Sequence, residues 1–136
     1  MTYLGLDLGT RTLGLSISSS SIATSLKTIR YESIDKLIEE LEKVIAEYKV
    51  DCLVLGLPKN MNNTIGPRAL ETLEFKERLE KLNYKVELQD ERLSTVSAHN
   101  YMIEADLSRK KRKEKVDALA ATIILQTYLD RKGNEK

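Results

Sequence analysis

Cysteine and long hydrophobic runs are nearly absent from this sequence, and each absence excludes a class of protein. Cys52 is the only cysteine, so no internal disulfide can form and no Cys/His cluster can hold zinc. The longest apolar run, Cys52 to Leu57, is far shorter than the roughly 20 residues that cross a bilayer. The N-terminus lacks the basic and apolar segments of a secretory signal. We therefore expect a soluble cytoplasmic protein with no membrane partner.

Aromatic residues are also scarce, with no Trp, one Phe and six scattered Tyr. This composition offers little for stacking unpaired bases, so a nucleic acid would be recognised by its shape and backbone. Neither GxxxxGKS, GxxxxGKT nor GxGxxG occurs, which weighs against nucleotide binding. We expect His99 to have a surface or packing role and Cys52 to act as a small hydrophobe.

The length of 136 residues and the apolar content of 41% suit a single domain over residues 1–136 with one ordinary core. No repeat, linker or low-complexity tract divides the sequence. The 22 Lys and Arg almost balance the 21 Asp and Glu, so the net charge of +1 indicates no polyanion partner by itself.

Hydrophobic periodicity predicts a mixture of strands and helices. Three short strands fill residues 2–30, and a helix over residues 34–48 begins after Ser33 as N-cap. A buried strand follows at Cys52–Leu57, and then a helix after Pro67 that carries Leu70, Leu73, Leu79 and Leu82. Next comes a half-exposed edge strand from Tyr84 to Leu88, with Lys85, Glu87 and Gln89 outward. The last two elements are a short helix starting near Ser94 and a helix from about Lys115 to Arg131. This order predicts an α/β protein with a five-stranded mixed sheet, in which three antiparallel strands precede two parallel ones, helices flank the sheet and the first strand is central.

Asp7 is the first chemically informative residue, because it lies within an apolar strand and strands disfavour both Asp and Gly. With a period of two, Gly5, Asp7 and Gly9 share one face. The carboxylate is therefore expected on a surface without large neighbours, where a substrate backbone can approach closely. The structural alternative is an Asp that initiates a turn at the end of the strand.

Two further acidic positions are unusual for charged groups. Asp117 shares the core-facing stripe of the last helix with Ala120, Ala121, Ile124, Leu125 and Tyr128. The alternative is that the helix dipole favours an Asp in the first turn. This would explain why Asp117 lies near the start of the helix, but not why it lies on the core-facing side. The pair Asp90–Glu91 ends a strand in the parallel part of the sheet, where ligands collect, with Glu91 at the mouth. Alone, such a pair is more often solvated surface.

Taken together, the carboxylates predict a metal site, because Asp7, Glu91 and Asp117 come from elements that could converge at one edge of the sheet. Such a cluster repels itself unless cations fill it, and oxygen-only ligands suit Mg²⁺ or Mn²⁺. Two such ions would activate a water and stabilise the leaving oxygen in phosphodiester hydrolysis.

Positive charge is concentrated directly before Asp117. Residues 109–115, RKKRKEK, carry a local charge of +5 and leave −4 for the rest of the chain. We expect a mobile loop that orders on a polyanion, with contacts to nucleic-acid backbone from Arg109, Lys110, Lys111, Arg112, Lys113 and Lys115. The alternative is a solvated basic face.

Four ordered motifs resemble those of a known family. GLDLGTRTLGLSIS at 5–18, GLPKNMNNTIGPRA at 56–69, DERLST at 90–95 and KVDALAATIILQTYLD at 115–130 look like the motifs of the YqgF/RuvX family, first described as Holliday junction resolvases and now regarded as pre-16S rRNA nucleases. The resemblance implies a ribonuclease H-like fold. It also implies a magnesium-dependent nuclease that matures the 5′ end of small-subunit ribosomal RNA in the bacterial cytoplasm.

The family's acidic positions fall on Asp7, Glu91 and Asp117, the three carboxylates selected above. Asp7 is expected to bridge two Mg²⁺ ions, while Glu91 and Asp117 each hold one side. The residues expected to contact phosphate are Arg11, Lys59, Asn60, Arg92 and the basic run 109–115.

Some positions depart from the family's usual motifs. Leu8 stands where an aromatic residue is common, Ser19 where Asp is frequent, and Asn62–Asn63 where Asp-Gly is frequent. None of these removes a member of the acidic triad.

We expect structured RNA, as pre-16S rRNA or a ribosomal precursor particle, to be the partner of a monomer or weak homodimer. Two alternatives stay open: a Holliday junction resolvase-like nuclease of branched DNA, and a non-catalytic RNA-binding ribosome-assembly factor. A further alternative takes Gly5–Thr10 as a phosphate-binding turn of the actin-like and sugar kinase superfamily, which shares this sheet. Those proteins need a second domain, for which 136 residues are expected to leave no room.

Overall fold

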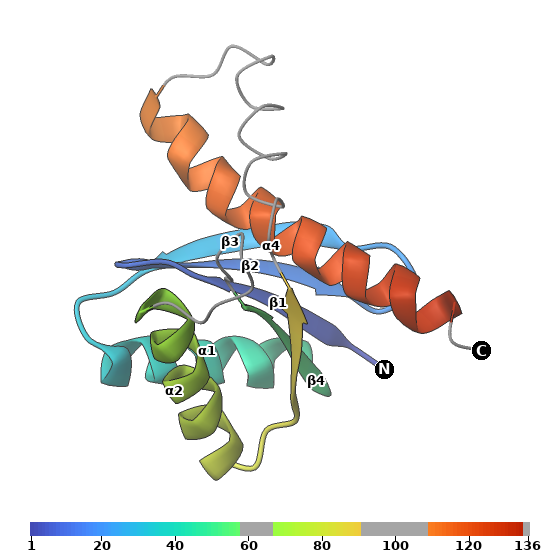
Figure 1. Ribbon diagram of the computed structural model, residues 1–136, viewed down its shortest axis with the longest axis horizontal. Helices are drawn as coiled ribbons and strands as arrows, with labels where there is room; N and C mark the ends of the chain where they lie inside the picture. Colours follow the sequence, from blue (N-terminus) through green and yellow to red (C-terminus); the bar gives the residue numbers. More distant parts are fainter. Residues whose placement is uncertain (58–66, 91–108, 135–136) are drawn as a thin grey trace.

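The computed structural model describes residues 1–57, 67–90 and 109–134, which form one five-stranded sheet with helices on both faces (Figure 1). The strands are β1 (Tyr3–Leu8), β2 (Thr12–Ser18), β3 (Thr24–Arg30), β4 (Cys52–Leu57) and β5 (Val86–Asp90). The helices are α1 (Ile34–Tyr48), α2 (Pro67–Lys81) and α4 (Arg109–Asn134). The short helix predicted near Ser94 lies outside the described residues and stays a prediction.

The sheet is mixed and β1 is central, as predicted. The strand order is β3-β2-β1-β4-β5. β1 pairs antiparallel with β2 and parallel with β4, and β5 joins β4 in parallel as an edge strand. All six residues of β1 are buried, because both edges of the strand are paired and both faces are covered. The central strand is therefore a rigid mount for a functional side chain.

Alternation along β1 divides its side chains between two cores. The leucines of β1 pack with α1 and α2, whereas Tyr3 packs with Tyr128 and its neighbours in α4. Figure 1 shows the same division, with α1 and α2 on one side of the sheet and α4 across the other. Since Gly5 and Asp7 share the face of Tyr3, Asp7 lies on the α4 side.

Helix α1 begins and ends where the sequence predicts. The Ser33 side chain caps its start by accepting a hydrogen bond from the Lys36 backbone N–H, and Lys49 ends it in the left-handed conformation. The buried face consists of Leu37, Ile38, Leu41, Val44 and Ile45, which follow the predicted helical spacing.

Helix α2 begins at Pro67, where the sequence predicts a helix, but only some of the predicted leucines face the core. Leu70 is 54% exposed, and Leu82 lies beyond the end of the helix and is 42% exposed. The buried positions are Ala69, Thr72, Phe75 and Leu79. Leu70 precedes Phe75 by five residues, which places it about 140° around the helix from the aromatic ring. Burial of Phe75 therefore leaves Leu70 outside.

The basic run is helical, which corrects the expectation of a loop over residues 109–115. Helix α4 begins at Arg109 rather than near Lys115 and continues to Asn134. Lys and Arg are good helix formers, since their straight side chains lose little rotamer freedom in a helix. The run therefore extends the last helix by more than a turn.

The edge strand β5 differs from its predicted pattern on one face. Val86 is buried in the α1–α2 core, but Gln89, predicted to face solvent, is also only 6% exposed. The sheet is covered on both sides at this point, because α4 contacts β5 from the opposite face. None of the described helices is long and apolar enough to cross a bilayer.

Candidate active site

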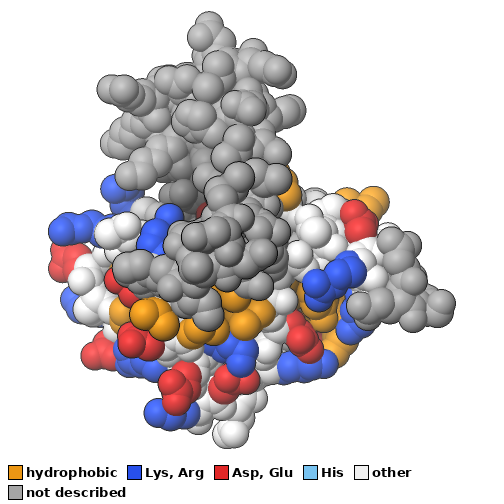
Figure 2. Space-filling model, in the orientation of Figure 1, with side chains coloured by type: hydrophobic (Ala, Val, Ile, Leu, Met, Phe, Trp, Pro, Cys, Tyr) orange, Lys and Arg blue, Asp and Glu red, His pale blue; other side chains and the backbone are white. Residues whose placement is uncertain are grey.

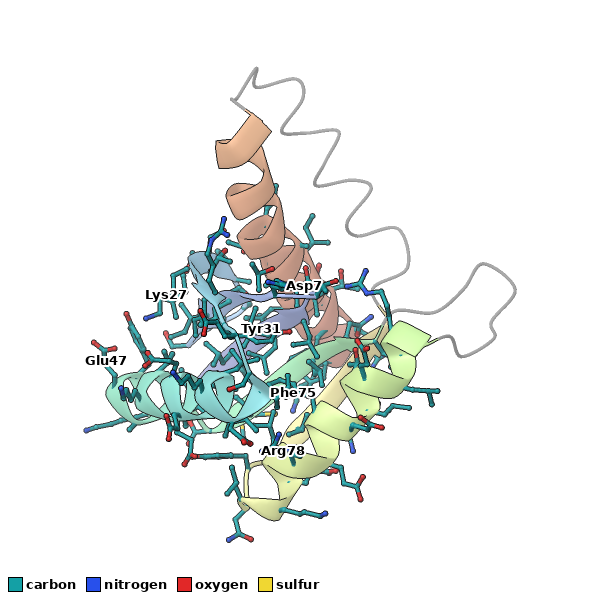
Figure 3. All side chains as sticks on the ribbon, turned by 90° about the vertical axis from the view of Figure 1, so that its left-hand side faces the viewer. Asp7, Lys27, Tyr31, Glu47, Phe75 and Arg78 are labelled. Carbon is teal, nitrogen blue, oxygen red and sulfur yellow. The ribbon has the colours of Figure 1, made fainter. Side chains whose placement is uncertain are left out.

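Asp7 occupies a buried position near the end of the central strand. It is 9% exposed and is paired across the β1–β2 ladder with Gly14. Figure 3 shows Asp7 at the level of the sheet beside α4. A carboxylate in such a place loses much of its hydration, and burial of this kind is costly unless a partner offsets it. The sequence placed Asp7 on an open surface, whereas the structure buries its side chain.

The glycine before Asp7 serves helix packing rather than the approach of a substrate, which corrects the sequence interpretation of Gly5. A Cβ atom at Gly5 would lie 2.2 Å from Ser16 Oγ, 2.8 Å from the Ala121 carbonyl oxygen and 2.8 Å from Leu125 Cβ. These distances are too short for any side chain. Helix α4 therefore fills the space that the sequence pattern left open.

The packing of α4 on β1 has a clear register. At the start of the strand, the rings of Tyr3 and Tyr128 lie 5.8 Å apart, and further along Gly5 meets Leu125 and Ala121. The strand and the helix therefore run in opposite directions. The predicted buried stripe of α4 is confirmed for Ala120, Ala121, Ile124, Leu125 and Tyr128.

Hydrogen bonds hold the turn that follows Asp7 from the opposite side of the sheet. The Tyr31 hydroxyl donates to the Gly9 carbonyl at 2.7 Å, and the Arg68 guanidinium donates to the Leu8 carbonyl at 3.1 Å. The Gly9 N–H donates to the Thr12 carbonyl at 2.7 Å. Sequence reasoning gave no role to Tyr31 or Arg68. For Arg68 the only signal was its place within the motif at 56–69.

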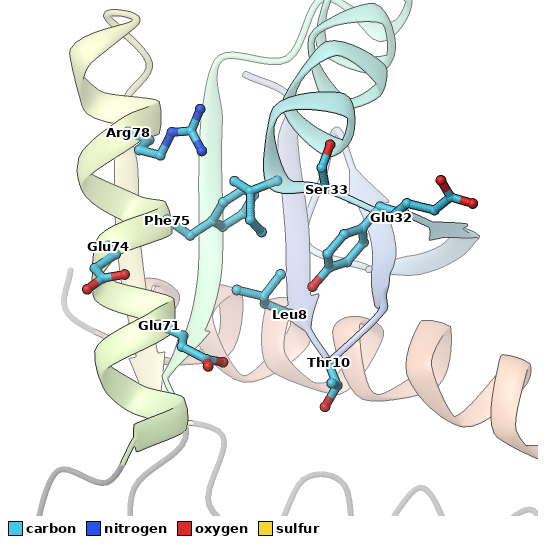
Figure 4. Close-up of a pocket in the computed structure, with 10 residues that line it drawn as sticks. Leu8, Thr10, Glu32, Ser33, Glu71, Glu74, Phe75 and Arg78 are labelled. Atoms are coloured by element: carbon cyan, nitrogen blue, oxygen red, sulfur yellow. The ribbon is translucent and has the colours of Figure 1, made fainter.

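A cavity of about 320 Å³ lies beneath this turn, between α1 and α2 (Figure 4). Leu8 and Phe75 form part of its wall, and the carboxylates of Glu71 and Glu74 belong to its lining. Burial, together with the nearby Glu71 carboxylate, raises the pKa of the Tyr31 hydroxyl. The cavity faces away from Asp7, and its acidic lining disfavours phosphate.

Arg11 lies exposed in the turn directly after β1. Together with Arg30 and Lys36 it lines an open depression of about 730 Å³, which Glu32, Glu39 and Glu40 also border. Over α1 and α2, Figure 2 shows Lys and Arg side chains interspersed with Asp and Glu. The cations near Arg11 therefore lie among acidic neighbours.

The structure does not describe every predicted site residue. Lys59, Asn60, Glu91 and Arg92 lie outside the described residues. Asp117 and the basic run belong to α4, but their side chains are not described. Within residues 1–57, 67–90 and 118–132, no three His, Cys, Asp or Glu side chains come together as metal ligands. The convergence of the three carboxylates stays a prediction.

Cys52 has the packing role that the sequence predicts. Its side chain is 1% exposed in the core between the sheet and α4. Burial raises the pKa of the Cys52 thiol, which disfavours the reactive thiolate.

The mixed five-stranded sheet, with helices on both faces and a buried carboxylate on its central strand, defines a protein of the ribonuclease H-like fold. The Thermus thermophilus RuvC in complex with a Holliday junction substrate superposes with a TM-score of 0.60 at 15% identity, covering 98% of this chain and 96% of that one. The Fowlpox virus resolvase, in complex with Holliday junction DNA, gives 0.57 at 13% identity, covering 96% and 98%.

The chain belongs to the RuvX family, whose model, described as Holliday junction resolvase, matches residues 1–131. A relative from Clostridium botulinum strain Alaska E43, named "Putative pre-16S rRNA nuclease", is 54% identical over 134 residues, covering 96% of this chain and 98% of the relative. The family resemblance of the four motifs is thereby confirmed.

Proposed function

We propose that this protein is a metal-dependent nuclease that processes the 5′ end of pre-16S ribosomal RNA in the cytoplasm. The observation that carries the proposal is the buried Asp7 carboxylate on the central strand, next to the helix that bears Asp117. Membership of the RuvX family and the name of the Clostridium botulinum relative support the nuclease activity and the RNA substrate.

The register of α4 supports the joining of Asp7 and Asp117 in one site. From Gly5 to Asp7 the strand advances roughly 6.6 Å, and from Ala121 to Asp117 the helix returns roughly 6 Å. β1 and α4 run in opposite directions, and Gly5 lies against Ala121. The displacement from Gly5 to Asp7 along the strand and that from Ala121 to Asp117 along the helix therefore point in the same direction. Asp7 and Asp117 therefore occupy corresponding positions on the facing elements.

A hard divalent cation fits this donor set. Asp7, Glu91 and Asp117 offer only carboxylate oxygens, which Mg²⁺ and Mn²⁺ prefer. Gly14, paired with Asp7, adds no side chain that would compete for the space of a partly hydrated ion. When bound, the metal supplies an activated water and stabilises the charge on the leaving oxygen. Asp7, Glu91 and Asp117 would hold the cation, with Asp7 fixed on the central strand.

Basic residues position the phosphate backbone in this proposal. Residues 109–115 form the start of α4, directly before Asp117, so their charge lies on the same helix as a metal ligand. Arg11 follows β1 in an exposed turn three residues beyond its end. Arg92, Lys59 and Asn60 are assigned further phosphate contacts from the family motifs. Neutralisation of phosphates by these residues makes binding salt-dependent.

Branched DNA is the second candidate substrate. The family model is described as Holliday junction resolvase, and the names of both solved structures above include a Holliday junction substrate. The name of a relative at 54% identity favours pre-16S rRNA over that alternative, because structures at 15% identity or less support only the fold.

The test is a competition in one reaction between pre-16S rRNA and a four-way DNA junction, with Mg²⁺ present or chelated. We expect Mg²⁺-dependent cleavage of the RNA and little cleavage of the junction. Preferential cleavage of the junction would overturn the RNA assignment. RNA binding without cleavage, and without Mn²⁺ binding in calorimetry, would instead indicate a ribosome-assembly factor.

A further inference from the structure

The contact between Ser16 and α4 is next to the proposed metal site, because Gly5, the partner of Ser16, precedes Asp7 by two residues on β1. Ser16 is fully buried on β2 and is paired across the ladder with Gly5. Its hydroxyl donates to the Ala121 carbonyl at 2.7 Å, a buried hydrogen bond between residues 105 positions apart. This carbonyl belongs to a continuous helix, so the bond ties the backbone of α4 to the sheet.

Gly5 and Ser16 together determine how closely α4 approaches the sheet. At Gly5 a Cβ atom would overlap with Ser16 Oγ, the Ala121 carbonyl and Leu125 Cβ, so a side chain there would push the helix outward. The Ser16 hydroxyl has the opposite effect, because its hydrogen bond to the Ala121 carbonyl holds the helix close to the sheet. The separation of strand and helix is therefore set from both directions at this pair.

Asp7 and Asp117 are the next facing positions beyond this pair. Asp7 follows Gly5 by two residues on the same face of β1, and Asp117 precedes Ala121 by one turn of α4. A displacement of α4 at Ala121 is carried to Asp117 because the helix is rigid over one turn. Mg²⁺ requires ligands at about 2.0–2.1 Å in near-octahedral geometry, so small shifts between ligands weaken its binding.

We infer that Ser16 is a positioning residue that sets the distance between the metal-holding carboxylates through its bond to the Ala121 carbonyl. The inference rests on the proposed function, since it requires Asp7 and Asp117 to share a cation. Residues that support metal ligands without touching the metal typically contribute 10–100-fold to metal affinity. Ser16 acts through the helix, so the effect is expected near the lower end of that range.

A second hydroxyl contact to α4 provides a matched control. Ser25 Oγ on β3 lies 2.8 Å from Thr122 Oγ1, at an exposed site away from Gly5. Ser25→Ala removes the same group as Ser16→Ala, but at an exposed site where water replaces the lost hydrogen bond, so α4 keeps its position. Ser25 lies on the strand that forms the far edge of the sheet, two strands from Asp7.

The experiment measures Mn²⁺ binding by calorimetry without RNA, thermal unfolding without metal, and kcat and KM for pre-16S rRNA, in the full chain. We expect Ser16→Ala to weaken Mn²⁺ binding about tenfold and to lower kcat with little change in KM. Ser25→Ala is expected to keep the wild-type Mn²⁺ affinity and kcat. A purely structural role for Ser16 would lower thermal stability and leave Mn²⁺ affinity unchanged.

Ser16→Cys guards against a Ser16→Ala protein that does not fold. The thiol fills the site and keeps a weak donor, but its contact with the Ala121 carbonyl is longer, so α4 shifts while the core stays filled. We expect a folded protein whose Mn²⁺ affinity lies between those of Ser16→Ala and wild type. Wild-type Mn²⁺ affinity in a folded Ser16→Cys protein would refute the inference alone. Absence of both Mn²⁺ binding and cleavage in the wild type would refute the proposed function, and the inference with it.

Discussion

At the scale of single residues, a side chain that conflicts with its surroundings was the best guide to the site. Asp7 lies in a strand of otherwise apolar and small residues, and the structure buries it to 9% exposure. Strand propensity and burial both disfavour a carboxylate there, so its presence indicates a functional requirement. Periodicity also identified the face on which Asp7 lies. It did not reveal that α4 covers Gly5 on that face, because a pattern within one strand carries no information about its distant partner.

Tyr31 shows the same limit, because its partner is 22 positions away in the sequence. Its hydroxyl donates to the Gly9 carbonyl in the turn after Asp7. We predict that Tyr31→Phe lowers the free energy of unfolding by about 1 kcal/mol, the typical net value of one such hydrogen bond. Urea denaturation measures the change. Tyr84→Phe, which removes a hydroxyl bonded to the Glu42 carboxylate at 3.0 Å on a different part of the surface, serves as the comparison.

At the scale of elements, the existence of helices and strands was predictable and their buried faces were less so. α1 matches its prediction because five apolar residues at one spacing leave a single choice of face. In α2 the leucines spread around the helix, and the choice of face depends on how Phe75 enters the core. That choice is made by tertiary packing, which the local pattern does not contain.

The α2 assignment can be tested with two identical substitutions. Leu79 is fully buried, whereas Leu70 is 54% exposed on the same helix. We predict that Leu79→Ala lowers the free energy of unfolding by about 2–5 kcal/mol, because it leaves a cavity in the core. Leu70→Ala is expected to change it by less than about 0.5 kcal/mol. Comparable losses in the two variants, measured by urea denaturation, would contradict the observed orientation of α2.

The helical state of the basic run gives a second prediction at this scale. Residues 109–115 are already helical in α4. Their backbone therefore loses less conformational entropy on binding phosphate than a loop would lose. We predict that the triple substitution Lys110→Gln, Lys111→Gln and Lys113→Gln weakens RNA binding and reduces the slope of log K against log salt by up to about 2–3, since each lost phosphate contact removes roughly 0.7–0.9.

The matched control replaces lysines of the other helices. Lys43 and Lys76 form exposed i,i+3 and i,i+4 ion pairs on α1 and α2. Lys43→Gln with Lys76→Gln is expected to leave both RNA affinity and salt slope near the wild-type values. Equal effects per lysine replaced would mean that binding follows net charge alone.

At the scale of the whole molecule, burial of neutral acids makes the fold sensitive to alkaline pH. Burial raises the pKa of the Cys52 thiol above 9.0 and those of the Tyr31, Tyr84 and Tyr128 hydroxyls above 10.0. Above those reference values the unfolded chain loses protons that the folded protein retains. The free energy of unfolding therefore falls as pH rises through this window.

We predict a decline in stability from pH 9 upward, measured by urea denaturation at pH 8, 9 and 10. Cys52→Ala removes the group with the lowest reference pKa, so its decline between pH 9 and 10 should be shallower than that of the wild type. Identical slopes for the two proteins would show that the Cys52 thiol does not contribute.

The overall topology was the most predictable level. Three strands on short connections had to form antiparallel pairs, and the helix between β3 and β4 had to return the chain for a parallel pairing with β1. That arrangement makes β1 central and places Asp7 inside the molecule. The buried stripe of α4 was predictable from Ala120 to Tyr128, while the position of the Asp117 carboxylate on it stays a prediction. The hydrogen bonds of Tyr31 and Arg68 to the turn after Asp7, and the Gly5–Ser16 contact with α4, join residues far apart in the sequence. The local sequence pattern therefore could not reveal them.

The central claim is that Asp7 holds the metal that drives cleavage of pre-16S rRNA. The most direct measurement is the rate of Mg²⁺-stimulated cleavage by Asp7→Asn, with its thermal unfolding recorded alongside. Asp51→Asn is the matched control, because Asp51 precedes β4 and accepts the Thr2 backbone N–H at the opposite end of the sheet. The account predicts a folded Asp7→Asn protein whose cleavage falls more than about 100-fold, while Asp51→Asn cleaves at the wild-type rate. A folded Asp7→Asn protein that cleaves at the wild-type rate would contradict it.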